Sequence, residues 1–336
     1  MCLVIGNNRS FVSDNDIVVY KYVTRTNNGY KTPYQHHPVK VNQMLTASEN
    51  GEAIVREYCR KHQIEGGAIH SCVSSKDKNF SDNVCLKAVI PAGTEFWIQD
   101  DMKQIASRQL LITDEVVEDE RHTDMSELFK FVYDNAPSNK DGIKVGDVLL
   151  SNGEVVSPLA DFDKTKVIGY VGYIHPLTDK AVFIGLENDS LPFATDYNIR
   201  NSSHSDISSS EVENDFEGHK HTYDIANAED YNSDIFKAIE YCRQYRTEGT
   251  NRGDWYLPAI GEAIALAKNI RYINASIEYL HIGDTLNFDW MWSSSQTGDG
   301  SYSWCCYLDD GDCGYYWYNR VCKRQVRPLF AFIKQA

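Results

Sequence analysis

An acidic segment near the middle of the chain constrains the fold more than any other feature of the sequence. Residues 114 to 125 (DEVVEDERHTDM) carry six acidic side chains in twelve positions. Like charges at this density resist burial in a core, so we expect an exposed connector here. At 336 residues the chain also exceeds the usual size of a single domain. We therefore predict an α+β chain with a first domain over residues 1 to 113, a linker with a short helix over residues 114 to 143, and a second domain over residues 144 to 336.

The N-terminal part is predicted to be a small α+β module, and its role is not assigned by the sequence. Residues 15 to 23 are rich in β-branched and aromatic side chains, which favours a strand. Residues 48 to 62 are predicted to form a helix that Ser48 can cap. Two further strands are predicted over residues 66 to 73 and 83 to 98.

The pattern changes in the C-terminal part, where short strands are separated by turn signals. The predicted strands span residues 144 to 150, 151 to 156, 166 to 174 and 180 to 187. A stretch dominated by Ser, Asn, Asp and His, residues 198 to 222, is expected to be a long surface loop. Helices are predicted over residues 126 to 134, 234 to 246 and 259 to 280.

The end of the chain is unusually aromatic. In SWCCYLD the strand alternation places Trp304, Cys306 and Leu308 on one face and Cys305, Tyr307 and Asp309 on the other. Asp310 and Gly311 then supply a hairpin turn, and YYWYN follows at residues 315 to 319. Rigid Tyr rings beside small polar residues give a large contact area at a low cost in side-chain entropy. This composition predicts a binding surface.

Four ordered motifs in this part of the chain carry a family resemblance. They are GDWYLPAIGEAIAL (253 to 266), MWSSSQ (291 to 296), SW (303 to 304) and VRPLFAF (326 to 332). In this order and spacing they resemble the C-type-lectin-fold domains of diversity-generating retroelement variable proteins and related bacterial and phage surface proteins. The stretch from residue 145 to 174 is similar to the opening strands of such domains, so the likeness covers about residues 144 to 334. The resemblance implies a C-type-lectin-like second domain.

The resemblance also implies which residues contact a ligand. In that family the variable positions lie between the SW and RP landmarks, where adenine-directed mutagenesis of Asn codons diversifies them. The residues at these positions in this chain are Ser303, Cys305, Tyr307, Asp309, Asp310, Asp312, Gly314, Tyr315, Tyr316, Tyr318 and Asn319. Each of these residue types can be reached from an Asn codon by changing adenines, whereas Trp cannot. The expected function is recognition of a protein or glycan on a target surface by a hypervariable Tyr- and Asp-rich face.

Two other functions fit parts of the same sequence. An enzyme on the formylglycine-generating version of this broad fold would use reactive cysteines, and Cys305, Cys306 and Cys313 are near one another in the sequence. A structural subunit of a phage tail or surface fibre would use the aromatic segment as an oligomer interface. Strand alternation turns Cys306 inward and leaves the other two cysteines at variable positions, so no catalytic residue is expected.

No cofactor or metal is expected from the motifs. The Glu-Pro-Asn, Gln-Pro-Asp and Trp-Asn-Asp triplets of calcium-dependent sugar-binding lectins are absent, and the nine cysteines contain no CxxC pair. The pairs His36 with His37 and His219 with His221 have a spacing usable by a metal, but we interpret them as solvated loop residues.

Several large side chains in the motifs are interpreted as scaffold. We expect Trp255, Trp290, Trp292 and Trp304 to fill the core. For Arg327 we expect a structural ion pair with a buried carboxylate such as Glu262.

Charge and hydropathy limit the partners and the location. A net charge of -15 repels phosphates and anionic lipids, so neither nucleic acid nor a membrane surface is an expected partner. No apolar run is long enough to span a bilayer. The first residues, MCLVIGNNRS, lack the basic start and apolar core of a secretory signal, so cytoplasmic synthesis is expected. A surface role would then need delivery in a virion, such as a phage tail, or by a non-Sec route.

Overall fold

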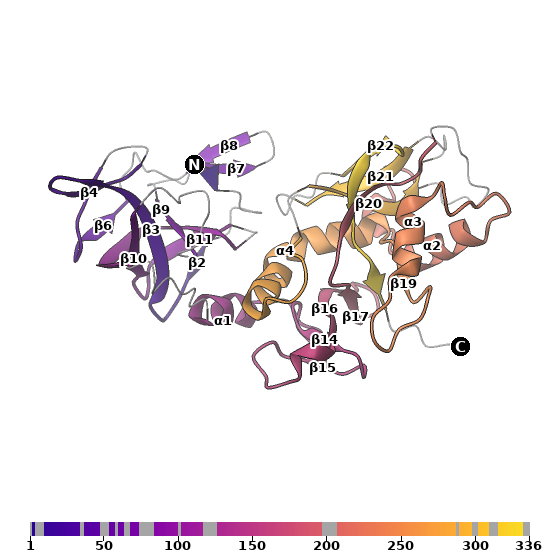
Figure 1. The fold of residues 1–336 in the computed structure, drawn as a ribbon, viewed down its shortest axis with the longest axis horizontal. Helices are drawn as coiled ribbons and strands as arrows, with labels where there is room; N and C mark the ends of the chain where they lie inside the picture. The colour runs from indigo at the N-terminus through magenta and orange to yellow at the C-terminus, as the bar shows by residue number, and fades with distance from the viewer. Residues whose placement is uncertain are drawn as a thin grey trace. The chain divides into compact units, whose positions relative to one another are not determined.

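In the computed structural model the chain divides into two compact units, residues 1 to 134 and 135 to 336. The structure describes residues 2–3, 10–33, 37–47, 54–57, 60–63, 68–73, 84–99, 102–116, 126–196, 207–286, 289–297, 302–308 and 315–331. Figure 1 shows the fold, which is mixed α+β with mostly antiparallel sheets. The predicted connector helix is present as α1 (Ser126–Asp134), and it groups with the first unit. Residues 117 to 125 of the predicted acidic connector lie outside the described residues.

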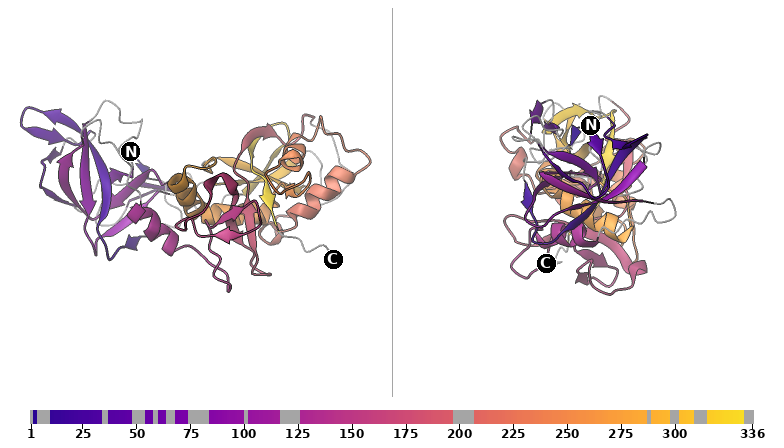
Figure 2. Two further views of the ribbon diagram at one scale, coloured as in Figure 1. Left: turned by 60° about the horizontal axis from the view of Figure 1, so that its bottom comes forward. Right: turned by 90° about the vertical axis from the view of Figure 1, so that its left-hand side faces the viewer.

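The first unit is built around one large sheet. Its central strands β3 and β10 pair antiparallel along seven residues, and the order across the sheet is β2-β11-β12-β9-β3-β10-β13-β6. The strands β4 and β5 extend β3, and β1, β7 and β8 form a separate small sheet. Figure 2 shows the strong twist of the long strands. The strands are β1 (Cys2–Leu3), β2 (Phe11–Val12), β3 (Ile17–Thr26), β4 (Gly29–Lys31), β5 (Pro38–Val39), β6 (Met44–Thr46), β7 (Ile54–Glu57), β8 (Arg60–Gln63), β9 (Ile69–Cys72), β10 (Val84–Ile90), β11 (Glu95–Ile98), β12 (Gln104–Ser107) and β13 (Gln109–Glu115).

The helix predicted over residues 48 to 62 is wrong. Its described part forms two strands, β7 and β8, which pair with each other, and β7 also pairs in parallel with β1. The β-branched pair Ile54 and Val55 suits a strand better than a helix. Pairing with a strand from elsewhere in the chain then overrides the local helical spacing. Ser48, the predicted cap, lies outside the described residues.

The second unit contains two sheets. The first has the order β15-β14-β16-β17-β24-β19, in which a strand near the end of the chain pairs with strands from the beginning and middle of the unit. The second has the order β18-β23-β20-β21-β22. The strands are β14 (Val148–Leu150), β15 (Val155–Val156), β16 (Val167–Ile174), β17 (Ala181–Ile184), β18 (Asp189–Pro192), β19 (Trp255–Tyr256), β20 (Trp290–Gln296), β21 (Tyr302–Tyr307), β22 (Tyr315–Asn319), β23 (Lys323–Val326) and β24 (Leu329–Phe330).

Helices cover both faces of the second sheet. The long helix α4 (Ile260–Leu280) packs on β20 and β21 and also on β16 of the first sheet. The other two helices of the unit are α2 (Gly218–Asn227) and α3 (Lys237–Gln244), which lie close to the second sheet in Figure 1. On the face opposite α4, they close a core that includes Phe236, Trp292, Cys305 and Val326. The predicted helices over residues 234 to 246 and 259 to 280 are confirmed. The start of α2 was predicted as loop, because its few apolar residues do not show a helical period.

A buried carboxylate joins α4 to the first sheet. Oε1 of Glu262 accepts hydrogen bonds from the hydroxyls of Tyr173 at 2.7 Å and Tyr256 at 2.9 Å, and Oε2 accepts one from the backbone N–H of Ala259 at 2.7 Å. Burial raises the pKa of Glu262 to about 7, and the nearby negative charge of Asp215 acts in the same direction.

The predicted pairing of Arg327 with Glu262 is wrong. The tyrosine hydroxyls and a helix N–H already provide the donors that Glu262 needs. The guanidinium of Arg327 is fully buried, and among the described residues it has no hydrogen-bond partner. Burial lowers the pKa of Arg327 to about 10, an effect that the nearby Tyr245 and Asp284 oppose.

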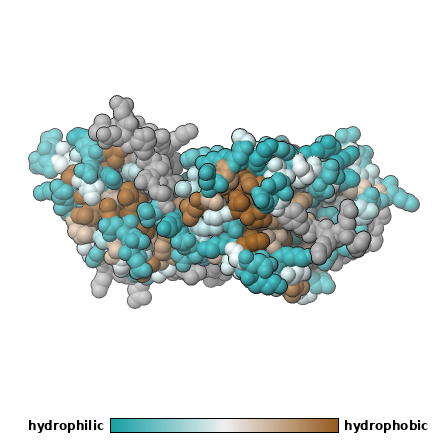
Figure 3. Space-filling model, turned by 90° about the horizontal axis from the view of Figure 1, so that it is seen from below, coloured by the Kyte–Doolittle hydropathy of each residue, from teal (hydrophilic) through white to brown (hydrophobic). Residues whose placement is uncertain are grey.

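The exposed surface of one face and the length of the helices bear on whether this chain could contact a membrane. On the face shown in Figure 3, hydrophobic residues form patches set among hydrophilic ones. None of the helices in the described part of the chain is both long and apolar enough to cross a bilayer.

The raised pKa of Glu262 predicts a pH dependence of stability. The folded protein binds this proton more tightly than the unfolded chain, whose carboxyl titrates near 4.5, so the stabilisation is complete below about pH 4.5 and is lost as pH rises through about 7. A shift of this size corresponds to about 3 kcal/mol of unfolding free energy. In Glu262→Gln this part of the pH dependence should disappear when urea unfolding is followed from pH 4.5 to 8. Parallel pH profiles for the variant and the wild type would contradict the assignment.

Candidate functional site

The strand β22 forms one edge of the second sheet of the C-terminal unit. It pairs antiparallel with β21 in a regular register, in which Trp304 lies opposite Trp317 and Cys305 opposite Tyr316. Within the described residues, no strand pairs with its other side. The sequence of β22, YYWYN, contains no charged residue and no proline, although natural edge strands commonly use both to discourage contacts.

Six aromatic rings form a continuous row across β20, β21 and β22, which we call the aromatic band. In order, the rings belong to Tyr307, Trp290, Tyr318, Tyr316, Trp317 and Tyr302. The centroids of successive rings are 5.1, 4.9, 5.6, 5.1 and 4.7 Å apart. These are the separations at which aromatic pairs attract each other, so each ring supports its neighbours.

The centre of the band is its most exposed part. The side chains of Tyr316 and Trp317 are 50% and 40% exposed, and their ring planes differ by 17°. Consecutive residues of a strand point to opposite faces of a sheet, so two such rings can stack only by leaning past the edge of the strand. Because β21 occupies the inner side of β22, we infer that the two rings stack around the outer edge of the strand. The band therefore passes from one face of the sheet to the other.

A cation lies on the ring of Tyr318, next to the exposed part of the band. The guanidinium carbon of Arg324, in β23, is 4.5 Å from the centroid of the Tyr318 ring. At this distance the charge interacts favourably with the face of the ring. The combination of Tyr, Trp and Arg side chains is the one most enriched in the energetically dominant parts of protein interfaces.

Two of the residues predicted to contact a ligand are not on the surface. Ser303 and Cys305 are both fully buried. Cys305 belongs to the core beneath α2 and α3, and its thiol points to the carbonyl oxygen of Tyr316 at 3.3 Å. Strand alternation assigns side chains to the two faces of a sheet, but it does not show whether helices cover those faces. Helices cover both faces of β21, so the predicted exposure of Ser303 and Cys305 is wrong.

The other described candidates lie on or beside the band. Tyr307, Tyr316 and Tyr318 belong to it, and Tyr315 contacts the ring of Trp304 at a centroid distance of 6.1 Å. Asn319 ends β22 and is partly exposed. The remaining candidates, Asp309, Asp310, Asp312 and Gly314, lie outside the described residues.

Sequence reasoning missed three rings of the band. Trp317 was left out because Trp cannot be reached from an Asn codon, yet it is one of the two most exposed rings. Tyr302 lies before the landmark at which the candidate segment starts. Trp290 was interpreted as core, and it is only partly buried, whereas Trp255, Trp292 and Trp304 are buried as predicted. The alternation of β20 against β21 could have placed Trp290 beside Tyr307.

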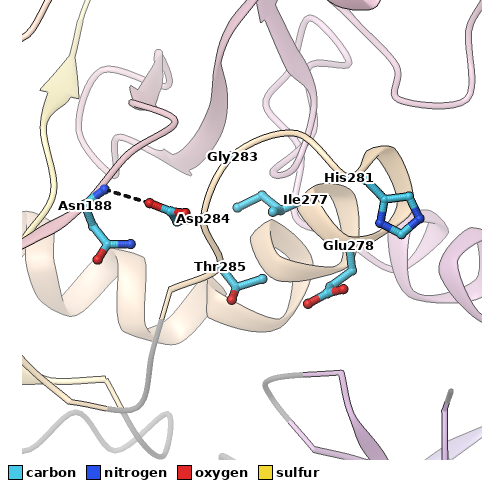
Figure 4. A pocket seen from close by; sticks show the side chains of 7 residues that line it. All are labelled: Asn188, Ile277, Glu278, His281, Gly283, Asp284 and Thr285. Carbon is cyan, nitrogen blue, oxygen red and sulfur yellow. Dashed lines mark hydrogen bonds between the residues drawn. The ribbon is translucent and has the colours of Figure 1, made fainter. Parts of the chain in front are cut away.

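A second candidate site is a pocket at the C-terminal end of α4. Its volume is about 500 Å³, and Figure 4 shows its lining residues Asn188, Ile277, Glu278, His281, Gly283, Asp284 and Thr285. The backbone N–H of Asn188 donates to the carboxylate of Asp284 at 3.3 Å. The carboxylates of the pocket belong to Glu278, in α4, and to Asp284, in the loop after α4. No group of three metal-binding side chains occurs in the described part of the chain. The pocket therefore offers polar walls without a recognisable reacting or coordinating centre.

The side chains of Cys305 and His221 lie in buried settings that favour a structural role. Burial raises the pKa of the Cys305 thiol, which disfavours the reactive thiolate. The solvated-loop interpretation of His219 and His221 is wrong, because both lie in α2. His221 is buried with Nε2 3.6 Å from the carboxylate of Asp215, and burial lowers its pKa.

Buried and exposed positions in this segment should respond differently to a charged substitution. Cys305→Asp places a carboxylate in an apolar core and should cost about 3 kcal/mol or more of unfolding free energy. Tyr316→Asp leaves the new charge in water and should cost about 1 kcal/mol or less. Urea unfolding of the two variants measures both values. Similar losses in the two variants would show that the burial of the two strands has been assigned wrongly.

Comparison with known proteins adds no assignment to this geometry. No protein-family model, curated protein or solved structure matches the chain.

Proposed function

We propose that this protein recognises a ligand through the aromatic band of a C-type-lectin-like C-terminal domain. The observation that carries the proposal is the exposure of Tyr316 and Trp317 on an edge strand whose other side chains are also largely aromatic. Exposing such rings has a free-energy cost in water, and soluble chains rarely gather them on one strand without a partner. The chemistry is recognition, in which no bond is made or broken.

The arrangement of the strands supports a lectin-like scaffold. Strand β24, near the end of the chain, lies between β17 and β19 in the first sheet. The strands of the second sheet, β18 and β20 to β23, come between β17 and β24 in the sequence. The four motifs that resemble retroelement variable proteins fall on β19 with α4, on β20, on β21 and on β23 with β24. The motif residues Trp255 and Trp292 are buried, as expected for residues that maintain a fold.

Affinity would come mainly from the rings, and polar neighbours would add specificity. Tyr and Trp present a rigid apolar surface and one hydrogen-bonding group each, so they lose little entropy on binding. The ligand would be a protein or a glycan on a target surface. Diversification by a retroelement would change Tyr307, Tyr315, Tyr316, Tyr318 and Asn319, while Trp317 would stay constant because its codon is outside the reach of the mechanism.

The first test is binding by wild type and a band variant to arrays of proteins and glycans. Replacing Tyr316 and Trp317 together by Ala should weaken binding to the true ligand by about tenfold to a hundredfold, because both lie at the centre of the surface. The matched control is Tyr223→Ala, which removes a ring that is 62% exposed on α2 and should leave affinity unchanged. Ligands that bind wild type and the double variant equally would refute the role of the band.

A separate test addresses diversification. The coding DNA should carry, in its downstream flank, a near-copy of codons 290 to 334 with adenines at the candidate positions and a neighbouring reverse transcriptase gene. Absence of such a copy would refute diversification. It would not affect the proposal that the band binds a ligand, which the array experiment tests independently.

A further inference from the structure

Arg320 is a buried cation placed directly after the last residue of β22. Only 1% of it is exposed. Its Nε donates to the hydroxyl of Ser303 at 3.1 Å, and its Nη2 donates to the side-chain oxygen of Gln296 at 2.7 Å. Both nitrogens also reach the carbonyl oxygen of Tyr302, at 3.3 and 3.2 Å. The planar fork of a guanidinium makes such divergent bonds from one rigid group.

We propose that Arg320 is the positioning residue of the recognition surface, a role that rests on the function proposed above. Its acceptors belong to β20 and β21, whereas its own backbone continues from β22. One side chain therefore joins the end of the edge strand to the two strands that lie inside it. The carbonyl oxygen of Arg320 also accepts a hydrogen bond from the N–H of Ala194 at 3.0 Å, which fixes the backbone at the same point.

The bonds of Arg320 do not depend on which rings the edge strand carries. Within the described part of the chain they end on a backbone carbonyl and on two buried side chains, and none of these acceptor atoms belongs to a side chain of β22. The guanidinium also lies 5.2 Å above the ring of Phe193, inside the core. The exposed residues of β22 can consequently be exchanged while the strand keeps its place.

This role explains a residue that the family resemblance placed at a variable position. Ser303 is fully buried, and its hydroxyl is one of the acceptors of Arg320. A buried acceptor of a charged donor is costly to remove, because the donor then loses a partner without access to water. Ser303 therefore belongs to the support of the surface and is not one of its contact residues.

Another buried arginine of the same unit provides a matched control. Arg327 is also fully buried, but among the described residues its guanidinium has no hydrogen-bond partner. Replacing it by Met removes a buried charge of the same kind without breaking a bond to β20, β21 or β22. Any effect that is specific to positioning should appear with Arg320 and be absent with Arg327.

The test compares Arg320→Lys, Arg320→Met, Ser303→Ala and Arg327→Met in the full chain. Hydrogen exchange of the β22 amides is one readout, and a second is the affinity of two antibody fragments selected in vitro. One fragment is selected on wild type and against Tyr316→Ala/Trp317→Ala, and the other is selected to bind around Tyr223 on α2. We expect exchange in β22 to rise about tenfold or more in both Arg320 variants, and affinity for the first fragment to fall about tenfold.

The controls separate positioning from a general loss of structure. Ser303→Ala should change both readouts in the same direction but less, because only one acceptor is lost. Arg327→Met should leave both unchanged, and no variant should affect the second fragment. Unchanged exchange and affinity in the Arg320 variants would overturn the proposal, and so would an equal loss for both fragments. Neither fragment is the natural ligand, so a failure of the proposed function would be seen on the arrays and not here.

Discussion

The packing of the C-terminal unit depends on how the buried start of α4 is satisfied. The first N–H groups of a helix have no partner within the helix, and burying them without one is costly. Here the N–H of Ala259 donates to Glu262, that of Ile260 to the hydroxyl of Ser295 at 2.8 Å, and that of Gly261 to the carbonyl oxygen of Asp215 at 2.9 Å. These partners come from the helix itself, from the second sheet and from the loop before α2. One helix end therefore holds three parts of the unit together.

The same hydrogen-bond network leaves no space for a side chain at Gly218, next to Glu262. A Cβ atom on Gly218, the first residue of α2, would lie 2.1 Å from the carboxylate of Glu262, so a larger residue would push the two helices apart. With α4 held on one face and α2 and α3 on the other, the middle of the second sheet is covered on both sides. A sheet covered in this way can carry exposed rings at its edge without depending on them for stability. Most of its contribution to the free energy of unfolding comes from the apolar side chains buried under the helices.

Much of the fold could be predicted from the sequence, and the errors have physical causes. The strands and helices of the C-terminal unit have clear periods and turn residues, and α4 lies within one residue of its predicted bounds. The strands β7 and β8 were predicted as a helix because their pairing with each other and with β1 is not local. Around the candidate site, the aromatic strand predicted over residues 315 to 319 is present as β22, and the roles of Tyr316 and Tyr318 in binding stay predictions. The burial of Cys305 could not be predicted, since it depends on helices from another part of the chain.

Edge geometry explains why the exposed surface is concentrated on β22. An inner strand such as β21 has neighbours on both sides and helices over both faces, so only its end residues Tyr302 and Tyr307 reach the band. An edge strand has one side without a neighbouring strand, and its side chains can turn around that side. Stacking of Tyr316 on Trp317 uses this freedom and joins the two faces into one surface. A recognition surface of this kind is limited to about the length of the edge strand, and it needs an anchor at the strand end that does not use the exposed side chains.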